Sequence, residues 1–471
     1  MSTFSGLNTA MTGLAAARMA METAGNNMTN VKTAGYTRQR AEFDSIGSVA
    51  TIGRLAGRSG PGQGVAFGGI ARLADAHLDA RVRGTLAIAS YSDTKAEGLS
   101  NLEGVLREPG ENGLSALLND FWAGWQDVAN QPGESSPAAV LLERAKSIAD
   151  RFALTHSEVS GQWSSQRATL DTMASELNSA AAAVAELNGQ IRSATATGGS
   201  PNALLDQRSQ LTERMAEISG ATVRDNADGS VDVLLDGNAL VSGTTIRPVQ
   251  VSGSATIDGT VAPSLQWAHR IGEPIALESG RMAAALSLLA PATAQGTGGK
   301  LAEMVKSLDS IARELATRVN LVQSEGRTVS GTVGPPFFAF DLDNPATSLR
   351  VVATGASDLA TGTPGGGALD GSNALRMSGL GSAKDGPDAL WNATVITVGV
   401  ASKSAAQQAL ASAVAASTAA GAQMSLSAVS LDEENVSLLA SQHAFQGAAR
   451  VMTAVDEMLD TLINRTGIVG R

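Results

Sequence analysis

Residues 427–464, near the C-terminus, read SAVSLDEENVSLLASQHAFQGAARVMTAVDEMLDTLIN and carry a heptad repeat of apolar side chains. Five of these side chains follow one another at steps of seven: Leu431, Leu438, Phe445, Met452 and Leu459. Val455 and Leu462 occupy the intermediate step. Ser430 and Glu433 form a capping box, and three acidic residues favour the positive end of a helix dipole. The stretch therefore predicts a helix from residue 431 with one narrow apolar face.

The first 30 residues predict a second helix with a less regular apolar stripe. Its members alternate between steps of three and four: Phe4, Leu7, Met11, Leu14, Met21 and Met28. Arg18 and Gly25 interrupt this stripe. A narrow stripe must be buried by another helix, and the two stripes lie at opposite ends of the chain. We therefore predict an antiparallel pair of terminal helices, with the rest of the chain looping out and back.

These stripes allow two interpretations when they are considered alone. The terminal helices can form an ordinary intramolecular pair that closes a globular domain. Because the stripes are rich in Met and Ala, they also suit packing against neighbouring copies of the chain.

The interior predicts a long helical body that includes a small β region. Residues 221–279 contain β-branched residues and Asp-Gly turns, which predict a meander of short strands. A stretch rich in Gly, Pro, Ser and Thr runs from about residue 326 to 370. Helices are expected over 75–108, 113–130, 137–152, onward to about 197, 201–219, 280–325 and 388–428. The predicted fold class is mainly α with a small β subdomain, built from antiparallel terminal helices and an elongated helical body.

Composition narrows the classes of function. The 471 residues carry a net charge of −11, which disfavours nucleic acid as a partner because phosphates need clustered Lys and Arg. The absence of cysteine excludes disulfides, thiolate metal sites and cysteine nucleophiles. No apolar stretch is long enough for membrane insertion, and the N-terminus lacks the pattern of a cleavable signal peptide.

Motifs with chemical potential are few. The four histidines lack the spacing of a metal site, and the Ser92-x-x-Lys95 pattern lacks its companion motifs. The acidic residues 432–434 are explained by helix capping rather than by glycosidase chemistry. The glycine-rich segment 60–69 is interpreted as a flexible loop. We therefore predict no catalytic residue, no cofactor, no metal and no enzymatic activity.

The segment after the first helix carries a family resemblance. Residues 26–39 read NNMTNVKTAGYTRQ, and this resembles the asparagine-rich box ending in Gly-Tyr of flagellar rod, hook and hook-associated proteins. Asparagine and glycine tolerate turn geometry, so the chain can leave the helix sharply. The residues that match the box are Asn26, Asn27, Asn30, Gly35 and Tyr36.

Two further regions make the resemblance more specific. The C-terminal run is similar to the terminal helix of the same proteins. The interior stretch 201–223, the helix starting at Pro137 and the segment 301–338 look like the middle of the flagellar hook-associated protein 1 family. Larger members have an outer β domain where this chain has only residues 341–370, so that domain is expected to be absent or vestigial.

The resemblance implies a structural role and an architecture. Residues 1–40 and 428–471 would form an inner tube, and residues 41–427 would form the helical body with its β meander. The protein would leave the cell through the flagellar type III apparatus, without a cleavable signal peptide, and stand outside the cell in the flagellum. Its partners would be copies of itself in a ring, hook protein, the next hook-associated protein, and an export chaperone on the C-terminal helix.

The resemblance also assigns an assembly interface to the two stripes. The predicted interface residues are Phe4, Leu7, Met11, Leu14, Met21, Met28, Leu431, Leu438, Phe445, Met452, Val455, Leu459 and Leu462. The function implied is a junction between hook and filament. The alternatives are another axial subunit, such as a hook or rod protein, and more remotely a secreted wall-cleaving hydrolase.

Overall fold

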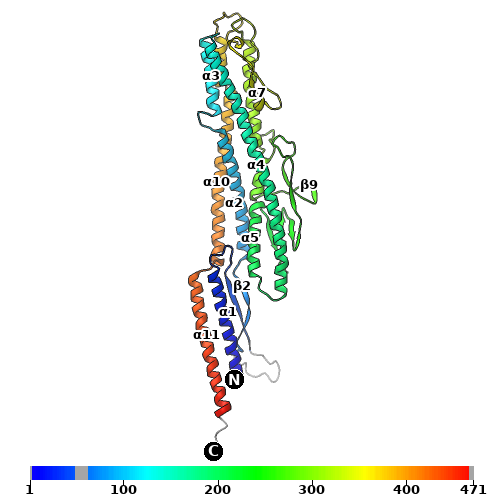
Figure 1. Ribbon diagram of the computed structural model, residues 1–471, viewed down its shortest axis with the longest axis vertical. Helices are drawn as coiled ribbons and strands as arrows, with labels where there is room; N and C mark the ends of the chain where they lie inside the picture. Colours follow the sequence, from blue (N-terminus) through cyan, green and yellow to red (C-terminus); the bar gives the residue numbers. More distant parts are fainter. Residues whose placement is uncertain (1–2, 48–61, 466–471) are drawn as a thin grey trace, which may run out of the picture.

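The computed structural model describes residues 3–47 and 62–465, with side chains from 5–47 and 62–463. The molecule is elongated, and a long helical body carries a pair of terminal helices at one end (Figure 1). Both ends of the chain lie at the tip of this pair, away from the body. We call α1, α11 and the hairpin beside them the terminal part, and the remainder the body.

The terminal part is built from two helices that pack side by side. α1 (Thr3–Thr29) and α11 (Leu431–Asp460) run antiparallel, and a π-helical turn (Thr461–Arg465) follows α11. This confirms the pairing predicted from the two stripes. The Ser430 hydroxyl accepts from the Glu433 amide, as the capping box predicts.

A two-stranded hairpin lies along α1. β1 (Gln39–Ser45) pairs antiparallel with β2 (Val65–Arg72), and both strands contact α1. The prediction of a flexible loop over 60–69 was wrong from residue 65 onward, while residues 60 and 61 lie outside the described residues. The glycine content of this segment disguised a strand, β2, which is held in place by its pairing with β1. The hairpin contacts α1, although the sequence interpretation placed residues 41–72 with the body.

The body is a bundle of long helices. α4 is one continuous helix of 62 residues, so the two successive helices expected over this range are in fact one. Its buried side chains recur along its whole length and meet the other helices in a single core. The helices of the body are α2 (Ala76–Leu106), α3 (Leu114–Asn130), α4 (Ser135–Ala196), α5 (Asn202–Ser219), α6 (Gly280–Leu289), α7 (Lys300–Glu325) and α10 (Pro387–Ser427).

The strands predicted over 221–279 are present as two small antiparallel sheets beside α4 and α5. Turns lie at the two predicted Asp-Gly positions, where Gly229 and Gly237 have φ of +81° and +72°. The four-stranded sheet contains β3 (Thr222–Asp225), β4 (Val231–Leu235), β5 (Asn238–Ser242) and β6 (Thr245–Ile246). The three-stranded sheet contains β7 (Val249–Ser252), β8 (Ser264–Trp267) and β9 (Arg270–Pro274).

The glycine-rich segment forms a packed tip at the far end of the body. Leu359, Ala360 and Thr361 are buried, and Arg327 pairs with Gly362 through backbone hydrogen bonds. Residues 341–370 hold only short elements. The elements of the tip are β10 (Phe338–Ala339), α8 (Pro345–Ser348), β11 (Arg350–Val351), a 3-10 turn (Ala356–Asp358), α9 (Ser372–Ser378) and a second 3-10 turn (Gly379–Ser382).

Among the described residues, no helix has both the length and the apolar character that a membrane span requires.

Candidate assembly site at the terminal helix pair

The seam between α1 and α11 is lined on the α1 side by small residues. Ala10, Ala17 and Ala24 are buried at seven-residue spacing. A Cβ atom added to Gly6 would stand 3.6 Å from Cγ2 of Val455, and one added to Gly13 would stand 3.9 Å from Cβ of Ala448. Such small side chains let two helices approach closely. The seam of α1 therefore consists of residues 6, 10, 13, 17, 20, 24 and 27, which alternate between steps of four and three.

This seam differs from the stripe that hydrophobicity predicted for α1. Leu7, Leu14, Met21 and Met28 are half-buried beside the seam, and Met11 is 55% exposed. Phe4 lies outside the residues whose side chains are described. Alanine and glycine contribute little to a hydrophobic pattern, yet they occupy the centre of a closely packed pair. The longer side chains reach around its edges.

On α11 the predicted stripe faces α1. Val455 is buried, and four further members are half-buried: Leu438, Phe445, Met452 and Leu459. Leu431 and Leu462 at the two ends of the stripe are exposed. Whether these side chains also contact another subunit stays a prediction.

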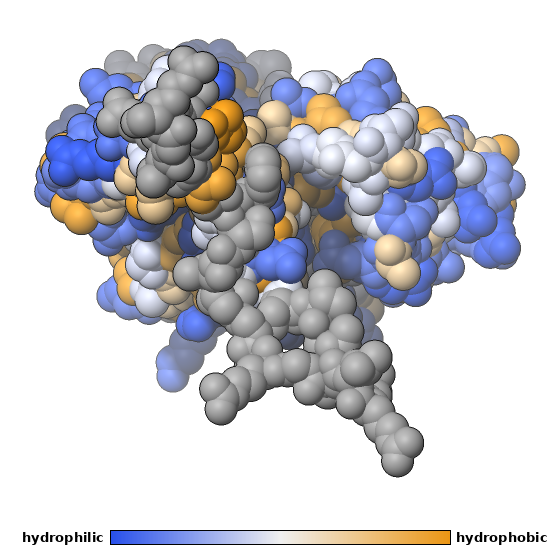
Figure 2. All heavy atoms as spheres, turned by 90° about the horizontal axis from the view of Figure 1, so that it is seen from below, coloured by the Kyte–Doolittle hydropathy of each residue, from blue (hydrophilic) through white to orange (hydrophobic). Residues whose placement is uncertain are grey.

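A second apolar stripe on α11 escaped the sequence interpretation. Val436, Val451 and Met458 are 68%, 51% and 54% exposed, and small apolar residues fill the helical steps between them. We call this set the outer stripe: Val436, Ala440, Ala444, Gly447, Val451, Ala454 and Met458. Seen from the end of the molecule that carries the termini, apolar and hydrophilic surface are interspersed (Figure 2). The alternating steps of three and four could have revealed this stripe, had alanine and glycine been counted.

The asparagine box closes the pair at its inner end through Asn27, whose side chain is 1% exposed. Its Nδ2 donates to the Gln39 carbonyl at 2.8 Å and to Oε2 of Glu434 at 3.0 Å. Its Oδ1 accepts from the Tyr36 hydroxyl at 2.8 Å and from the Gln39 amide at 3.0 Å. All four hydrogen-bonding positions of the amide are therefore used. One side chain joins α1, the segment after it, and α11.

Asn26 and Asn30 act more locally. Asn30 Nδ2 donates to the carbonyl and to Oδ1 of Asn26, at 3.0 and 2.8 Å. These bonds close the last turn of α1, where carbonyl groups lack helical partners. The box therefore combines one long-range contact with two local ones.

A buried carboxylate completes the contact. Glu434 is 3% exposed, and its Oε1 accepts from Arg38 Nε at 2.7 Å. Arg38 also donates from Nη1 to Glu433 at 2.5 Å. Burial opposes the charge of Arg38, but the hydrogen bond to Glu433 and the charge of Glu434 outweigh it and raise its pKa. Burial, with the charges of Asp206 and Glu434, raises the pKa of Tyr36 to about 12, so its hydroxyl stays a donor at neutral pH.

Gly35 is required by both backbone and packing. Its φ is +72°, in the left-handed region that favours glycine. A Cβ there would stand 1.7 Å from Nε2 of Gln210, which donates to the Ala34 carbonyl at 2.7 Å. The loop therefore rests directly on α5 of the body.

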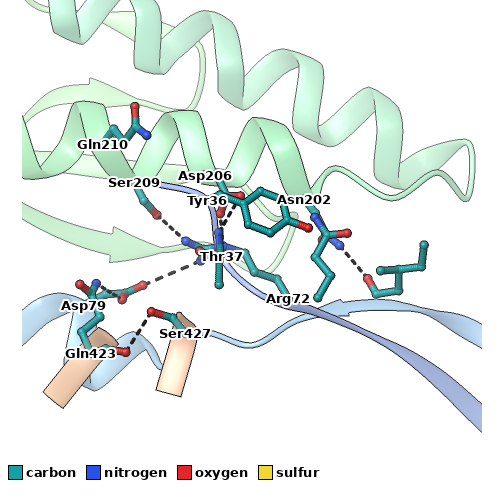
Figure 3. A network of polar contacts seen from close by, with 12 residues as sticks. Tyr36, Thr37, Arg72, Asp79, Asn202, Asp206, Ser209, Gln210, Gln423 and Ser427 are labelled. Carbon is teal, nitrogen blue, oxygen red and sulfur yellow. Dashed lines mark hydrogen bonds and ion pairs between the residues drawn. The ribbon is translucent and has the colours of Figure 1, made fainter. Parts of the chain in front are cut away.

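The terminal part meets the body at a polar joint (Figure 3). Asp206 of α5 accepts from the Thr37 amide at 3.2 Å and from Arg72 Nε at 2.6 Å. A cavity of about 580 Å³ lies between the loop 30–37, α2, α5 and the end of α10. The sequence interpretation missed Arg38, Arg72, Asp206 and Glu434. No local pattern singles them out, because each acts through a partner that is distant in the sequence.

The arrangement is suited to holding helices in register. Within 3–47 and 62–465, no three His, Cys, Asp or Glu side chains gather as a metal ion would require. Glu433 and Glu434 at the start of α11 are engaged with Arg38.

Comparison with known proteins places this architecture in a class. Residues 422–465, which include α11, match the family model Flagellar basal body rod FlgEFG protein C-terminal. Residues 99–338 match the model Flagellar hook-associated protein FlgK helical domain. The fold and the terminal pair are thus those of a structural protein of the flagellum.

The relatives specify the family. Flagellar hook-associated protein 1 of Bacillus subtilis is 30% identical over 514 aligned positions, which cover 100% of both chains. The protein of the same name from Salmonella typhimurium is 27% identical over 339 positions, which cover 71% of this chain and 59% of that one. The chain belongs to the flagellar hook-associated protein 1 family, which confirms the resemblance found in its sequence.

A solved structure shows the same fold. The flagellar hook junction protein FlgK from Burkholderia pseudomallei superposes with a TM-score of 0.64 at 14% identity. The match covers 74% of this chain and 100% of that chain.

Proposed function

We propose that this chain is a structural subunit of the junction between hook and filament and assembles as a ring of identical copies. The observation that carries the proposal is the outer stripe of α11, an apolar surface on a helix whose other apolar face already packs on α1. An exposed apolar stripe of this length is typical of a surface that is covered in an assembly. Hook protein would lie on one side of the ring and the next hook-associated protein on the other.

The shape of the molecule supports this role. The terminal part projects from one end of the body, so copies can contact one another through it while the bodies stand outside (Figure 1). We assign residues 1–40 and 428–471, with the hairpin, to an inner tube. The rest of 41–427 forms the outer body. In a closed ring of more than two copies, each subunit contacts its two neighbours through two different surfaces. The outer stripe of one copy can therefore contact a different face of the next copy.

Export precedes assembly in this proposal. The chain passes through the flagellar type III apparatus without a cleavable signal peptide and is extracellular when it functions. An export chaperone binds the C-terminal helix, whose apolar side chains lack their assembly partners until the ring forms. Such a chaperone would shield the outer stripe from aggregation.

The role is non-catalytic. The Ser92 hydroxyl donates to the Ile88 carbonyl, and Lys95 lies 5.5 Å from the centre of the Tyr91 ring. The serine–lysine pattern is therefore occupied by contacts within its own helix. These contacts support a structural interpretation over the hydrolase alternative.

Electron microscopy of a strain that lacks the gene tests the proposal. We expect hooks without filaments, and filaments should return when the chain is supplied. Absence of hooks would instead indicate a hook or rod subunit or a wall-cleaving enzyme, and intact filaments would exclude any junction role.

A point variant tests the outer stripe itself. Val451→Asp places a charge in the stripe without entering the seam with α1, and it should prevent filament attachment after normal export. Gln442→Asp, on the polar face of the same helix, is the matched control and should behave as wild type. Leu438 and Phe445 face α1, so substitutions there would disturb the pair itself and are less specific.

A further inference from the structure

One polar face of α5 contacts two segments of the terminal part where it meets the body: the segment 30–38, which joins α1 to β1, and the end of β2, after which the chain enters α2. Asn202, Asp206, Ser209 and Gln210 follow helical steps of four, three and one, which place them on the same side of the helix. Figure 3 shows Asp206 of this face turned toward Thr37, and Ser209 turned toward Arg72.

The segment 30–38 is held at two points. The Thr37 amide donates to Oδ2 of Asp206 at 3.2 Å, and Thr37 is 5% exposed. Gln210 Nε2 donates to the Ala34 carbonyl at 2.7 Å. The contact with Gly35 brings the backbone of the loop against the Gln210 side chain.

The end of β2 is held by the same helix. Arg72 Nε donates to Oδ1 of Asp206 at 2.6 Å, and Arg72 Nη2 donates to the Ser209 hydroxyl at 3.2 Å. Asn202 Nδ2 donates to the Ile70 carbonyl at 2.9 Å. Both oxygens of Asp206 are thus used, one for the segment 30–38 and one for β2.

The chain passes between the terminal part and the body twice, from β2 to α2 and from α10 to α11, and the second crossing is secured differently. The Arg38 amide donates to the Ser427 carbonyl at 2.8 Å, which links this crossing to the segment 30–38. The first crossing is therefore held on α5 directly, and the second is linked to α5 through the segment 30–38.

The central ion pair, Arg72 with Asp206, is largely buried, so it is favourable only when its two side chains are correctly placed. The side chains of Arg72 and Asp206 are 15% and 9% exposed, and Asp79 lies 3.9 Å from Arg72 Nη1. A buried ion pair adds little net stability because desolvation offsets attraction, but it strongly favours one arrangement of its partners. The ion pair therefore acts mainly by fixing how the end of β2 is oriented on α5.

We propose that the polar face of α5 is an orientation clamp, with Asp206 as the central positioning residue, which sets the angle between the terminal part and the body. The inference rests on the proposed function in one respect, that a defined angle is needed for copies to form a ring. The clamp itself is a property of the single chain and can be measured there.

Distances between spin labels test the clamp in the isolated full-length protein. The chain has no cysteine, so two introduced cysteines are labelled without background. Gln442→Cys in α11 with Ser179→Cys in α4 spans the joint, and Ser179→Cys with Ser404→Cys in α10 lies within the body. We expect a narrow distance distribution across the joint, at least twofold broader in Asp206→Ala, with the body pair unchanged. Asp171→Ala, which removes an Arg–Asp contact within α4, should leave both distributions unchanged.

Two further variants keep the test decisive. Arg72→Ala removes the other partner of the ion pair and should broaden the same distribution if Asp206→Ala folds poorly. Asp206→Glu retains the charge and should restore at least part of the narrowness. An unchanged joint distribution in folded Asp206→Ala and Arg72→Ala proteins would overturn the clamp.

Filament attachment separates the clamp from the proposed function. In the deletion strain, the clamp variants should be exported and attach fewer filaments than wild type. Normal filaments together with a broadened joint would overturn the link between angle and assembly. Failure of the wild-type chain to restore filaments would refute the junction role, while the spin-label result would still decide the clamp.

Discussion

Asn27→Ala should loosen the terminal helix pair without unfolding the body. The substitution removes four hydrogen bonds at once, including one to the buried carboxylate of Glu434. A neutral hydrogen bond contributes about 1 kcal/mol net, and one to a charged group about 1.5–3 kcal/mol. Tyr36 and Gln39 are only half-buried, so water can replace part of what they lose. We therefore expect a local loss of about 2–4 kcal/mol.

Hydrogen–deuterium exchange measures this loss directly. A change of about 2–4 kcal/mol in local opening corresponds to amide exchange that is roughly 30- to 1,000-fold faster in α1 and α11. All five tryptophans lie in the body, at positions 122, 125, 163, 267 and 391, so their fluorescence should report an unchanged denaturation midpoint for the body.

Asn26→Ala is the matched control for this experiment. Asn26 is exposed and contacts only its local turn, so exchange in α11 should stay at the wild-type rate. If Asn27→Ala exchanged no faster than Asn26→Ala, the view of Asn27 as the central connection would be refuted.

Three further substitutions probe the same region. Gly35→Ala should lower the melting temperature, because the left-handed φ costs about 1–2 kcal/mol and the new methyl group must displace Gln210; a wild-type melting curve would contradict this. Gly13→Ala should slow amide exchange in α1, since its Cβ would meet Ala448 at 3.9 Å and alanine is favoured over glycine in a helix by about 1 kcal/mol; faster exchange would show that the seam is too tight. Burial, with the charge of Asp79 adding to it, raises the pKa of Glu213 above 4.5, so the stability that its protonated form contributes is complete below pH 4.5 and is lost as the pH rises through the folded pKa. Glu213→Gln should therefore raise the melting temperature more at pH 7 than at pH 4, and equal changes at both pH values would argue against this titration.

The order of the helices was predicted correctly because the sequence features that specify a helix are local. Apolar periodicity, capping residues and breakers act within a few residues of the positions that they specify. The two apolar stripes at opposite ends of the chain predicted the antiparallel pair, since a narrow stripe must be covered by another helix. The prediction of two successive helices over the range of α4 was wrong because it used only local pattern. Packing along the whole body keeps this helix continuous.

The candidate site was predictable only in part. The asparagine box could be found from its residues, but the different roles of Asn26 and Asn27 could not, because they depend on Glu434 more than 400 positions away. The segment 355–368 lies in the stretch rich in Gly, Pro, Ser and Thr, whose composition gives no sign of burial. Leu359 and Ala360 are buried against the rest of the tip, so its deletion would open the core there.

By itself, the sequence determined the helical class, the strands of the meander, the pairing of the chain's two ends and the family resemblance, all of which rest on local pattern and motif. Only the tertiary structure decided that alanine and glycine line the seam of α1, that α11 has a second apolar stripe, and that α5 holds the joint through Asp206. The physical reason is that burial and ion pairing depend on which distant surfaces meet. Small and charged side chains give little indication in the sequence of which distant surface they will contact.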